Sequence, residues 1–423
     1  MGANPNTFQG IPETWSKEYQ IVHDKVPVYP AIANYRLAAG LKVGDTVHRS
    51  YPTSLVANTM GADGSYATQA VTDTDESLVI NKNYETSFYV KELDEIQNSL
   101  PVRSQYAKRS MVALFNQIDG DVLGLYDQFT QTLDAGDMGG TASQGVTITN
   151  SNVKSLFFTA KRLLQKQNIL LDNGAKFTGF KSEDDKNAMA VAVISPEVYQ
   201  HLLEALDGKD TALGDKVAQA GHAGAFAGFN IFVSNALGWS ASLAYDATTL
   251  TDADTVVING VTLTAETGSI DAAGKFKAET DGVTCITNLG GLINDPLDAG
   301  ADADFQAVSA ANALLLRNIV ATVSGGATGT MTLKATGWGH IVVSETLTPA
   351  ADVWTTNLQI QHCLFGLANS IDVVIQKEPT LRIKDAPSAK VGYDFITWAA
   401  AGYKVFNEGK AQMIDAWVRT DAY

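Results

Sequence analysis

Side chains suited to metal binding or catalysis are spread thinly along this chain. Its six histidines include no HxxxH or HxH pair: His23, His48, His201, His222, His340 and His362. A metal site would therefore need ligands from distant segments. The two cysteines, Cys285 and Cys363, show no CxxC spacing, which indicates free intracellular thiols. We expect surface or packed histidines, and we predict no metal site and no cofactor.

Two acidic clusters could supply a carboxylate pair or a cation site: Glu92, Asp94 and Glu95, and Glu183, Asp184 and Asp185. Such clusters are more often solvated, and the first also suits a helix N-terminus electrostatically. The basic residues Arg103, Lys108 and Arg109 could contact phosphate or an acidic partner protein. A solvated helix face is the favoured interpretation.

Nucleotide and hydrolase motifs are absent from the sequence. It contains no GxxxxGK[ST], no GxGxxG between a strand and a helix, and no GxSxG. Gly221, Gly224 and Gly228 are spaced like a phosphate cradle, but a strand rather than a helix N-terminus follows them. We expect them to allow a close backbone approach. No catalytic, cofactor-binding or metal residue is predicted, and the chain is predicted not to be an enzyme.

Composition narrows the class of protein. The chain has 423 residues, 45% of them hydrophobic and 18% charged, which predicts two or three ordered compact units. Its net charge of -16 argues against a sequence-reading DNA-binding protein. No basic segment followed by an apolar run opens the chain, and no window of 18 apolar residues occurs. We therefore expect neither a secretory signal nor a membrane span.

The N-terminal half predicts an arm, a hairpin and a long helix. Prolines and scattered aromatics in the first 40 residues indicate an extended arm that packs on another surface. Residues 43–55 and 78–96 alternate like two strands of a hairpin around a polar loop at 58–77. Apolar side chains recur at spacings of three and four from residue 101 to 133, which predicts one helix with a possible bend at Gly120 or Gly124.

The following segments predict a mixed α+β domain. Residues 151–169 are predicted to form an amphipathic helix, with Asn150 or Ser151 as its cap and one apolar face: Val153, Leu156, Phe157, Ala160, Leu163 and Leu164. A buried strand at 188–195 leads into a helix capped at Ser195 with Pro196 at its start, and another strand lies within 227–237. Residues 362–423 add further strands around a glycine-containing turn.

Residues 240–361 differ from their surroundings in composition. They are rich in Thr, Ala, Gly, Val and Asp, and alternating segments are separated by Asn-Gly and Gly-Gly turns. This pattern predicts short antiparallel hairpins. We call this segment the insertion. We expect it to leave and rejoin a discontinuous domain at one surface loop and to fold autonomously.

The order of these segments resembles the major capsid proteins of tailed bacteriophages, with the Hong Kong 97-type fold. The phrase AGFNIFVSNAL at 227–237 and the closing GYKV at 402–405, followed by MIDAWV, are similar to recurrent patterns of that family. The resemblance implies an N-terminal arm (1–42), an E-loop hairpin (43–96), and a spine helix with the peripheral domain (97–150). It further implies a first axial part (151–239), an inserted β-rich domain (240–361), and a second axial and peripheral part (362–423).

The resemblance also implies a function. The chain would self-assemble as hexamers and pentamers into an icosahedral head, as a procapsid that expands on genome packaging. The expected partners are a separate scaffolding protein, because the sequence shows no long charged helical segment at the N-terminus, together with a portal protein and a decoration protein. The shell would enclose double-stranded DNA without sequence-specific binding and without a membrane. It would assemble in the bacterial cytoplasm and reside in the virion.

Two alternatives stay open at the level of sequence. An encapsulin-like nanocompartment would share the fold but store cargo enzymes. A glycan-binding protein or adhesin would suit the Thr- and Gly-rich insertion, although the expected lack of a secretory signal argues against it. Some relatives cross-link their shells through Lys and Asn side chains. Lys82 and Lys91 lie near the hairpin, but nothing in the sequence marks a partner for them.

Overall fold

The computed structural model describes most of the chain, and it separates into two compact units. The described residues are 25–37, 45–53, 55–92, 102–167, 169, 190–207, 224–245, 250–270, 272–278, 281–297, 304–326, 328–335, 339–347, 353–354, 359–385 and 391–419. Unit 1 contains Asn83–Phe115 and Lys377–Ala399, and unit 2 contains Pro27–Lys82, Asn116–Gln376 and Ala400–Tyr423. The helix α3 (Val102–Leu123) and the strands β19 (Ile371–Asp385) and β20 (Gly392–Lys404) contribute to both.

Unit 1 is a helix packed on a small sheet. Strand β4 (Lys82–Lys91) pairs with β20, and β20 pairs with β19. Phe88 of β4 stacks on Phe395 of β20, with ring centroids 4.8 Å apart, and Tyr106 of α3 lies 5.8 Å from Phe88. The buried hydroxyls of Ser110 and Thr397 are 2.8 Å apart. One face of the sheet is therefore held against α3 by aromatic packing and a buried hydrogen bond.

The long helix ends earlier than predicted. The α-helix stops at Leu123, and a 3-10 helix η2 (Gly124–Gln128) follows, in which Leu125 leaves helical geometry at φ -81° and ψ 16°. Residues Gln131–Leu133 then form β5, which pairs in parallel with β21 (Met413–Arg419). The prediction of helix as far as residue 133 is wrong, because pairing with the last strand overrides the local apolar period. The predicted bend near Gly124 is confirmed as the point where the α-helix ends.

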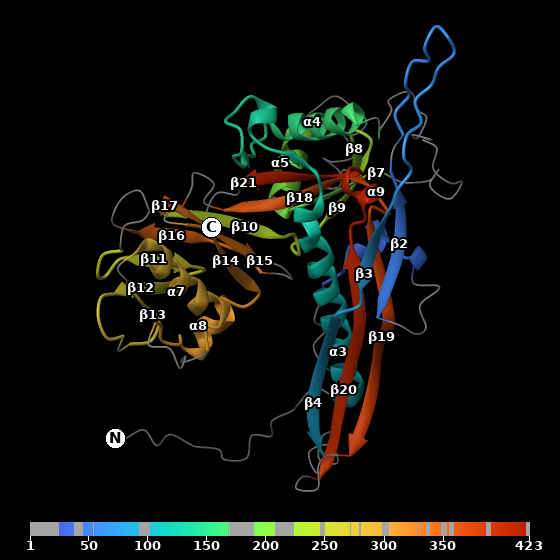
Figure 1. Ribbon diagram of the computed structural model, residues 1–423. Helices are drawn as coiled ribbons and strands as arrows, with labels where there is room; N and C mark the ends of the chain where they lie inside the picture. Colours follow the sequence, from blue (N-terminus) through green and yellow to red (C-terminus); the bar gives the residue numbers. More distant parts are fainter. Residues whose placement is uncertain are drawn as a thin grey trace, which may run out of the picture. The chain divides into compact units, whose positions relative to one another are not determined.

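Unit 2 is built on an 11-stranded sheet (Figure 1). Its main path runs in the order β14 (Ile319–Gly325), β15 (Gly329–Ala335), β10 (Trp239–Tyr245), β18 (Ile360–Leu367), β7, β9 and β8 (Ala225–Phe226). Strand β21 pairs with β18, β5 and β6 (Val146–Thr147). Strand β7 (Ala190–Ile194) runs parallel to β9 (Phe229–Val233), and the helix α5 (Pro196–Leu206) lies between them in sequence. A helix η3 (Gly136–Met138) precedes β6. The predicted strand, helix and strand of this region are confirmed.

Local sequence signals place the two helices that pack beside this sheet. Ser195 caps α5 by accepting a hydrogen bond from the Val198 N–H, and Pro196 occupies the first turn. Helix α4 (Val153–Lys166) buries the predicted face: Val153, Leu156, Phe157, Ala160, Leu163 and Leu164. Its N-cap is Asn152 rather than Asn150 or Ser151. The cap prediction was therefore wrong by one or two positions.

Gly228 lies in a tight turn. Ala227 and Gly228 adopt φ values of 52° and 94° between β8 (Ala225–Phe226) and β9, as a two-residue hairpin turn requires. A Cβ atom at Gly228 would meet open space. The expectation of a close backbone approach is therefore wrong for Gly228, whose freedom is needed for a left-handed conformation.

The insertion has its own hydrophobic core. Its elements are β10 (Trp239–Tyr245), β11 (Thr255–Ile258), β12 (Val261–Glu266), β13 (Lys275–Lys277), α7 (Gly282–Asn294), α8 (Ala310–Leu315), β14 (Ile319–Gly325), β15 (Gly329–Ala335), β16 (Val343–Thr346) and β17 (Val353–Trp354). All members of its buried cluster lie between Trp239 and Trp354. The predicted hairpins are confirmed at Asn259-Gly260, between β11 and β12, and at the glycine-rich turn between β14 and β15. Helix α7, capped by Asp281, was not predicted.

The insertion is joined to the rest of unit 2 through paired strands rather than through a loop. Trp239 and Ser240 of β10 pair with Gln361 and Ile360 of β18, so the segment leaves and returns at adjacent positions. The same β10 pairs along its length with β15. The expectation of nearby ends is confirmed, whereas that of attachment at a surface loop is wrong. The first strand of the insertion continues the sheet it leaves.

The hairpin and the arm differ in part from their predictions. Strand β2 (Thr46–Pro52) pairs with β3 (Asp73–Val79). The prediction of one second strand over residues 78–96 is wrong for residues 82–91, because these form β4 and pair with β20. In the described part of the arm, α1 (Tyr29–Ile32) and β1 (Ala33–Asn34) pack within unit 2. Residues 1–24 and 38–44 lie outside the described residues.

Two buried carboxylates hold this arm segment. Asp119 accepts hydrogen bonds from the N–H groups of Val28 (2.8 Å) and Tyr29 (2.6 Å), and Asp372 accepts one from the Asn34 amide (2.8 Å). Burial raises the pKa of Asp119 to about 6, although both backbone hydrogen bonds oppose the shift. Burial likewise raises the pKa of Asp372 to about 7, against the opposing charge of Arg49.

These pKa shifts predict a pH-dependent stability. The pKa values of both carboxyl groups in the folded state lie above the ordinary aspartate value of 3.8. The stability that the two groups contribute is therefore fully present below about pH 4 and is lost as the pH rises through 6 and 7. We expect the free energy of unfolding to fall by roughly 3 kcal/mol between about pH 5 and pH 8. Urea denaturation would measure it. The double variant Asp119→Asn, Asp372→Asn should flatten that slope, and an unchanged slope would contradict the assignment.

Candidate functional site

The residues considered for chemistry in the sequence do not converge in the described part of the chain. Glu92, Lys108 and Arg109 are exposed, and His48 pairs with Asp75 at 2.6 Å on the surface of the hairpin. His23, Asp94, Glu95, Glu183, Asp184, Asp185, Gly221 and His222 lie outside the described residues, as does the side chain of Arg103. The described residues contain no group of three potential metal ligands. They also contain no helix with the length and apolar character needed to span a membrane.

Both cysteines are buried, and neither belongs to a disulfide. Cys285 belongs to the core of the insertion, and Cys363 lies in β18. Burial raises the pKa of the Cys363 thiol to about 12, so it remains protonated near neutral pH. Because the thiolate is the reactive form of cysteine, Cys363 is suited to packing rather than to nucleophilic chemistry.

The structure brings together a serine, a histidine and an aspartate that the sequence keeps far apart. His362 Nε2 lies 2.8 Å from the Ser240 Oγ, and Nδ1 lies 2.8 and 2.9 Å from the two carboxylate oxygens of Asp415. Trp417 Nε1 donates a hydrogen bond to the same carboxylate at 2.8 Å. These distances match those of a hydrolase triad. The order of the partners along the chain offers no spacing signal by which the sequence could reveal them.

The surroundings of this cluster favour a structural role. The Tyr126 ring stacks on His362 with centroids 3.5 Å apart, and the side chains of His362 and Asp415 are 3% and 4% exposed. Ser240 lies on β10 between two paired neighbours, β15 and β18. A Cβ atom at Gly238 would lie 2.3 Å from Tyr126, so only glycine admits this ring. We interpret the cluster as a clamp that joins the insertion, the end of α3 and the last strand.

The clamp predicts a graded loss of stability. His362→Ala leaves the buried Asp415 carboxylate without its main partner and should lower the free energy of unfolding by about 3 kcal/mol. Ser240→Ala removes one hydrogen bond at the edge of the cluster and should cost about 1 kcal/mol. Urea denaturation of both variants would measure the difference. Equal effects, or none, would contradict the clamp.

The hairpin carries more exposed large hydrophobic side chains than any other described segment of unit 2. All described residues from 55 to 75 are exposed, among them five large hydrophobic side chains: Leu55, Val56, Met60, Tyr66 and Val71. We call residues 53–72 the tip. The Thr53 N–H donates to the Thr72 carbonyl at 3.0 Å, and the Gly61 N–H donates to the Ser65 carbonyl at 2.9 Å. The described residues of the tip thus have backbone hydrogen bonds but no core, which is typical of a surface that another molecule covers.

The base of the hairpin is anchored, in contrast to its tip. Leu78 is 1% exposed, and Arg49 forms an ion pair of 2.6 Å with Glu408 of α9 (Asn407–Lys410). The Lys404 ammonium donates to the Ser77 carbonyl at 2.8 Å, and the Asn407 N–H donates to Glu76 at 2.9 Å. The hairpin is therefore fixed where it begins and presents its tip to solvent.

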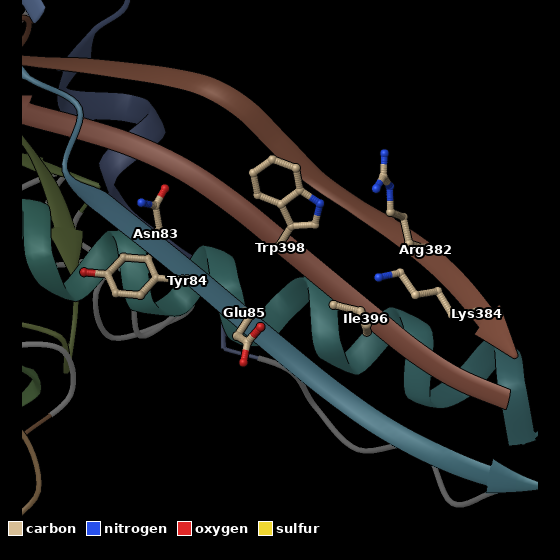
Figure 2. Close-up of a pocket in the computed structure, with 7 residues that line it drawn as sticks. All are labelled: Asn83, Tyr84, Glu85, Arg382, Lys384, Ile396 and Trp398. Carbon is tan, nitrogen blue, oxygen red and sulfur yellow. The ribbon is translucent and has the colours of Figure 1, made fainter. Parts of the chain in front are cut away.

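A second surface lies on the sheet of unit 1. It is a pocket of about 400 Å³. Figure 2 shows residues that line it, with Arg382 and Lys384 on β19, Ile396 and Trp398 on β20, and Glu85 on β4. The Lys377 ammonium lies 5.9 Å from the centre of the Trp398 ring. The pocket combines an aromatic surface with cations, and it contains no arrangement of nucleophile and base.

The whole chain is similar in fold to solved bacteriophage structures. The alignment with a structure from Mycobacterium phage Che8 has a TM-score of 0.56 at 14% identity, and it covers 97% of this chain and 98% of the phage chain. The alignment with the capsid structure of cyanophage P-SCSP1u has a TM-score of 0.54 at 12% identity, and it covers 99% of this chain and 98% of the phage chain. The capsid of Ralstonia phage GP4 gives 0.50 at 10% identity, with 100% of both chains covered. No protein-family model and no curated protein matches the sequence.

These comparisons establish the fold. The chain is a mixed α+β protein with the fold of solved bacteriophage structures, two of them named as capsids, over nearly its full length, which confirms the resemblance seen in the sequence. At such low identity the likeness extends to the fold alone. The assignment of individual segments as E-loop, spine helix or axial domain remains a prediction.

Proposed function

We propose that this chain is the major capsid protein of a tailed double-stranded DNA bacteriophage and that many copies assemble into its icosahedral head. The observation that carries the proposal is the likeness to phage capsid structures over 97–100% of this chain. The exposed tip supports it, because a shell subunit needs surfaces that only neighbouring copies cover. Hexamers and pentamers are the closed rings that such a shell uses.

The proposed mechanism is physical rather than catalytic. The anchored base fixes the direction of the hairpin, and the five hydrophobic side chains of the tip lie across an adjacent subunit. Burying a large apolar side chain fully contributes about 1.5–3 kcal/mol. Each contact is modest, but a subunit in a closed shell must lose several at once to leave, so the assembled shell is far more stable than one interface.

Further partners follow from the same proposal. A separate scaffolding protein directs the procapsid, a portal protein occupies one vertex, and a decoration protein can bind outside. The procapsid expands as double-stranded DNA is packaged. The enclosed DNA is not read by sequence, in keeping with the net charge of -16. Assembly takes place in the bacterial cytoplasm, and the product resides in the virion.

We place the insertion on the outer surface or at a subunit boundary. Residues 240–361 contain 13 acidic and 4 basic side chains, so they carry nine of the sixteen excess negative charges. Such a domain would repel DNA if it lined the interior. Its separate core supports an accessory role that the shell lattice does not require.

The tip provides a direct test. Replacing Leu55, Val56, Met60, Tyr66 and Val71 by Ser should leave the thermal unfolding temperature nearly unchanged, because none of these side chains is buried in the subunit. It should abolish particles in negative-stain microscopy of protein expressed with its scaffolding protein. The matched control is Leu314→Ser with Leu315→Ser, which changes exposed residues of the insertion. Normal particles from the tip variant would contradict the proposal.

The insertion can be tested by excision. Because Ser240 and Ile360 are paired neighbours, a short Gly-Ser turn can replace residues 241–359. We expect this variant to form shells of unchanged diameter in cryo-electron microscopy. A folded variant that fails to assemble would show that the insertion belongs to the lattice.

An encapsulin-like compartment is the alternative with the same fold. It predicts particles that contain a cargo enzyme rather than DNA, so the content of particles purified from the native source separates the two. A glycan-binding or adhesin function is a weaker alternative. Binding of the monomeric protein to a glycan array would favour it.

A further inference from the structure

A polar groove of about 790 Å³ in unit 2 lies where four parts of the chain meet. The base of the hairpin, the end of α3 with η2, strand β15 of the insertion, and the turn between β20 and α9 all contribute to its lining. Four lysines line it, namely Lys82, Lys334, Lys404 and Lys410, together with Asp121 and Asp127. A groove with this excess of cations is unexpected in a chain of net charge -16.

Both aspartates are already engaged. The Asp127 carboxylate pairs with Lys334 at 2.7 Å, and Asp121 accepts hydrogen bonds from the Tyr403 hydroxyl and, at 3.2 Å, from the Gln117 amide. Asp127 and Lys334 neutralise each other, whereas Asp121 keeps its negative charge beside neutral donors, so four lysines against two aspartates leave the lining with a net charge of +2.

The remaining lysines are incompletely compensated. Lys410 lies 3.8 Å from Glu76. Lys404 donates to the neutral Ser77 carbonyl and lies 5.4 Å from the centre of the Phe406 ring. Across the described ranges, neither Lys404 nor Lys82 has a carboxylate within ion-pair distance. The groove thus keeps positive charge that an anion could neutralise.

The volume of the groove and the lysines that line it limit the class of ligand. A volume of this order is typical of sites for small molecules and cofactors, about 300–1,000 Å³. Lysine ammonium groups are compact point charges that bind phosphate oxygens without the fixed fork of arginine. A DNA duplex is too wide to enter such a groove and would contact only its rim.

We propose that this groove binds a compact polyphosphate, either a free one or the phosphate chain of a nucleotide. Lys82 and Lys404 contribute the main charges, Lys410 assists them, and Lys334 is held back by Asp127. Because the lining comes from the hairpin base, the insertion and the end of α3, a bound polyphosphate stabilises their arrangement within unit 2. This inference does not depend on the proposed function, since binding is measurable on the unassembled chain.

The test is calorimetric titration of the full-length, unassembled protein with inorganic tripolyphosphate, ATP and a 20-base-pair DNA duplex, at low ionic strength. Lys404→Gln and Lys82→Gln should each weaken tripolyphosphate binding about tenfold. Asp127→Asn should strengthen it about threefold, because it frees Lys334. The matched control is Lys166→Gln, which removes the same charge from an exposed position on α4. Thermal unfolding of each variant confirms that it is folded.

The possible outcomes separate clearly. Equal affinity for tripolyphosphate and ATP would identify the phosphate chain alone as the ligand, whereas tighter binding of ATP would identify a nucleotide. Binding of the DNA duplex but not of tripolyphosphate would overturn the proposal, because it would show that the cations form an extended surface for polyanions. An equal loss in Lys166→Gln and Lys404→Gln, or no binding of tripolyphosphate at all, would overturn it as well.

Discussion

Strand β18 is the seam through which unit 2 is held together. Its eight residues are all buried, and they pair with β21 along one side and with β7 and β10 along the other. The chain enters the insertion through β10, which β15 and β14 extend within the same sheet, and it returns into β18 at the position beside β10. An independent core can thus be added without opening the sheet, since the two ends that must meet are already paired. The buried contacts between His362, Ser240 and Asp415 lie at this seam, where a misplaced strand would leave a carboxylate without partners.

In the hairpin, by contrast, the stabilising contacts lie at one end only. Its base is fixed by an ion pair, two hydrogen bonds and the buried Leu78, whereas its tip has backbone hydrogen bonds but no core. A two-stranded ribbon is marginally stable by itself, so an anchored base is what makes a projecting tip possible. The tip exposes apolar surface that the proposed association between copies would bury. A fixed base with an exposed apolar tip is what the proposed shell subunit would need in order to fold before it assembles.

The sequence predicted what depends on near neighbours in the chain. The cap of α5 at Ser195, the apolar face of α4 and the Asn259-Gly260 turn are local signals, and each is confirmed. The predictions failed where pairing with strands distant in the sequence determines the secondary structure. Residues 131–133 are strand because β21 lies beside them, and residues 82–91 join β20 rather than β2. Helix α7 was missed because its glycines, at 282, 290 and 291, obscure a helical pattern that only the core of the insertion stabilises. The contacts of His362 follow from pairing between strands, which no spacing reveals.

Charge is distributed as unevenly as stability. More than half of the negative excess resides in the insertion, whereas the groove beside η2 gathers four lysines. Lys334 is one of only four basic residues in the insertion, and it is the one that faces this groove, where Asp127 holds it and the Tyr126 ring lies 4.8 Å away. That ring also covers His362, so the charge contact and the buried clamp share one side chain. Through Tyr126, the position of an acidic domain is coupled to the end of α3, and a change at either place must be accommodated by the other.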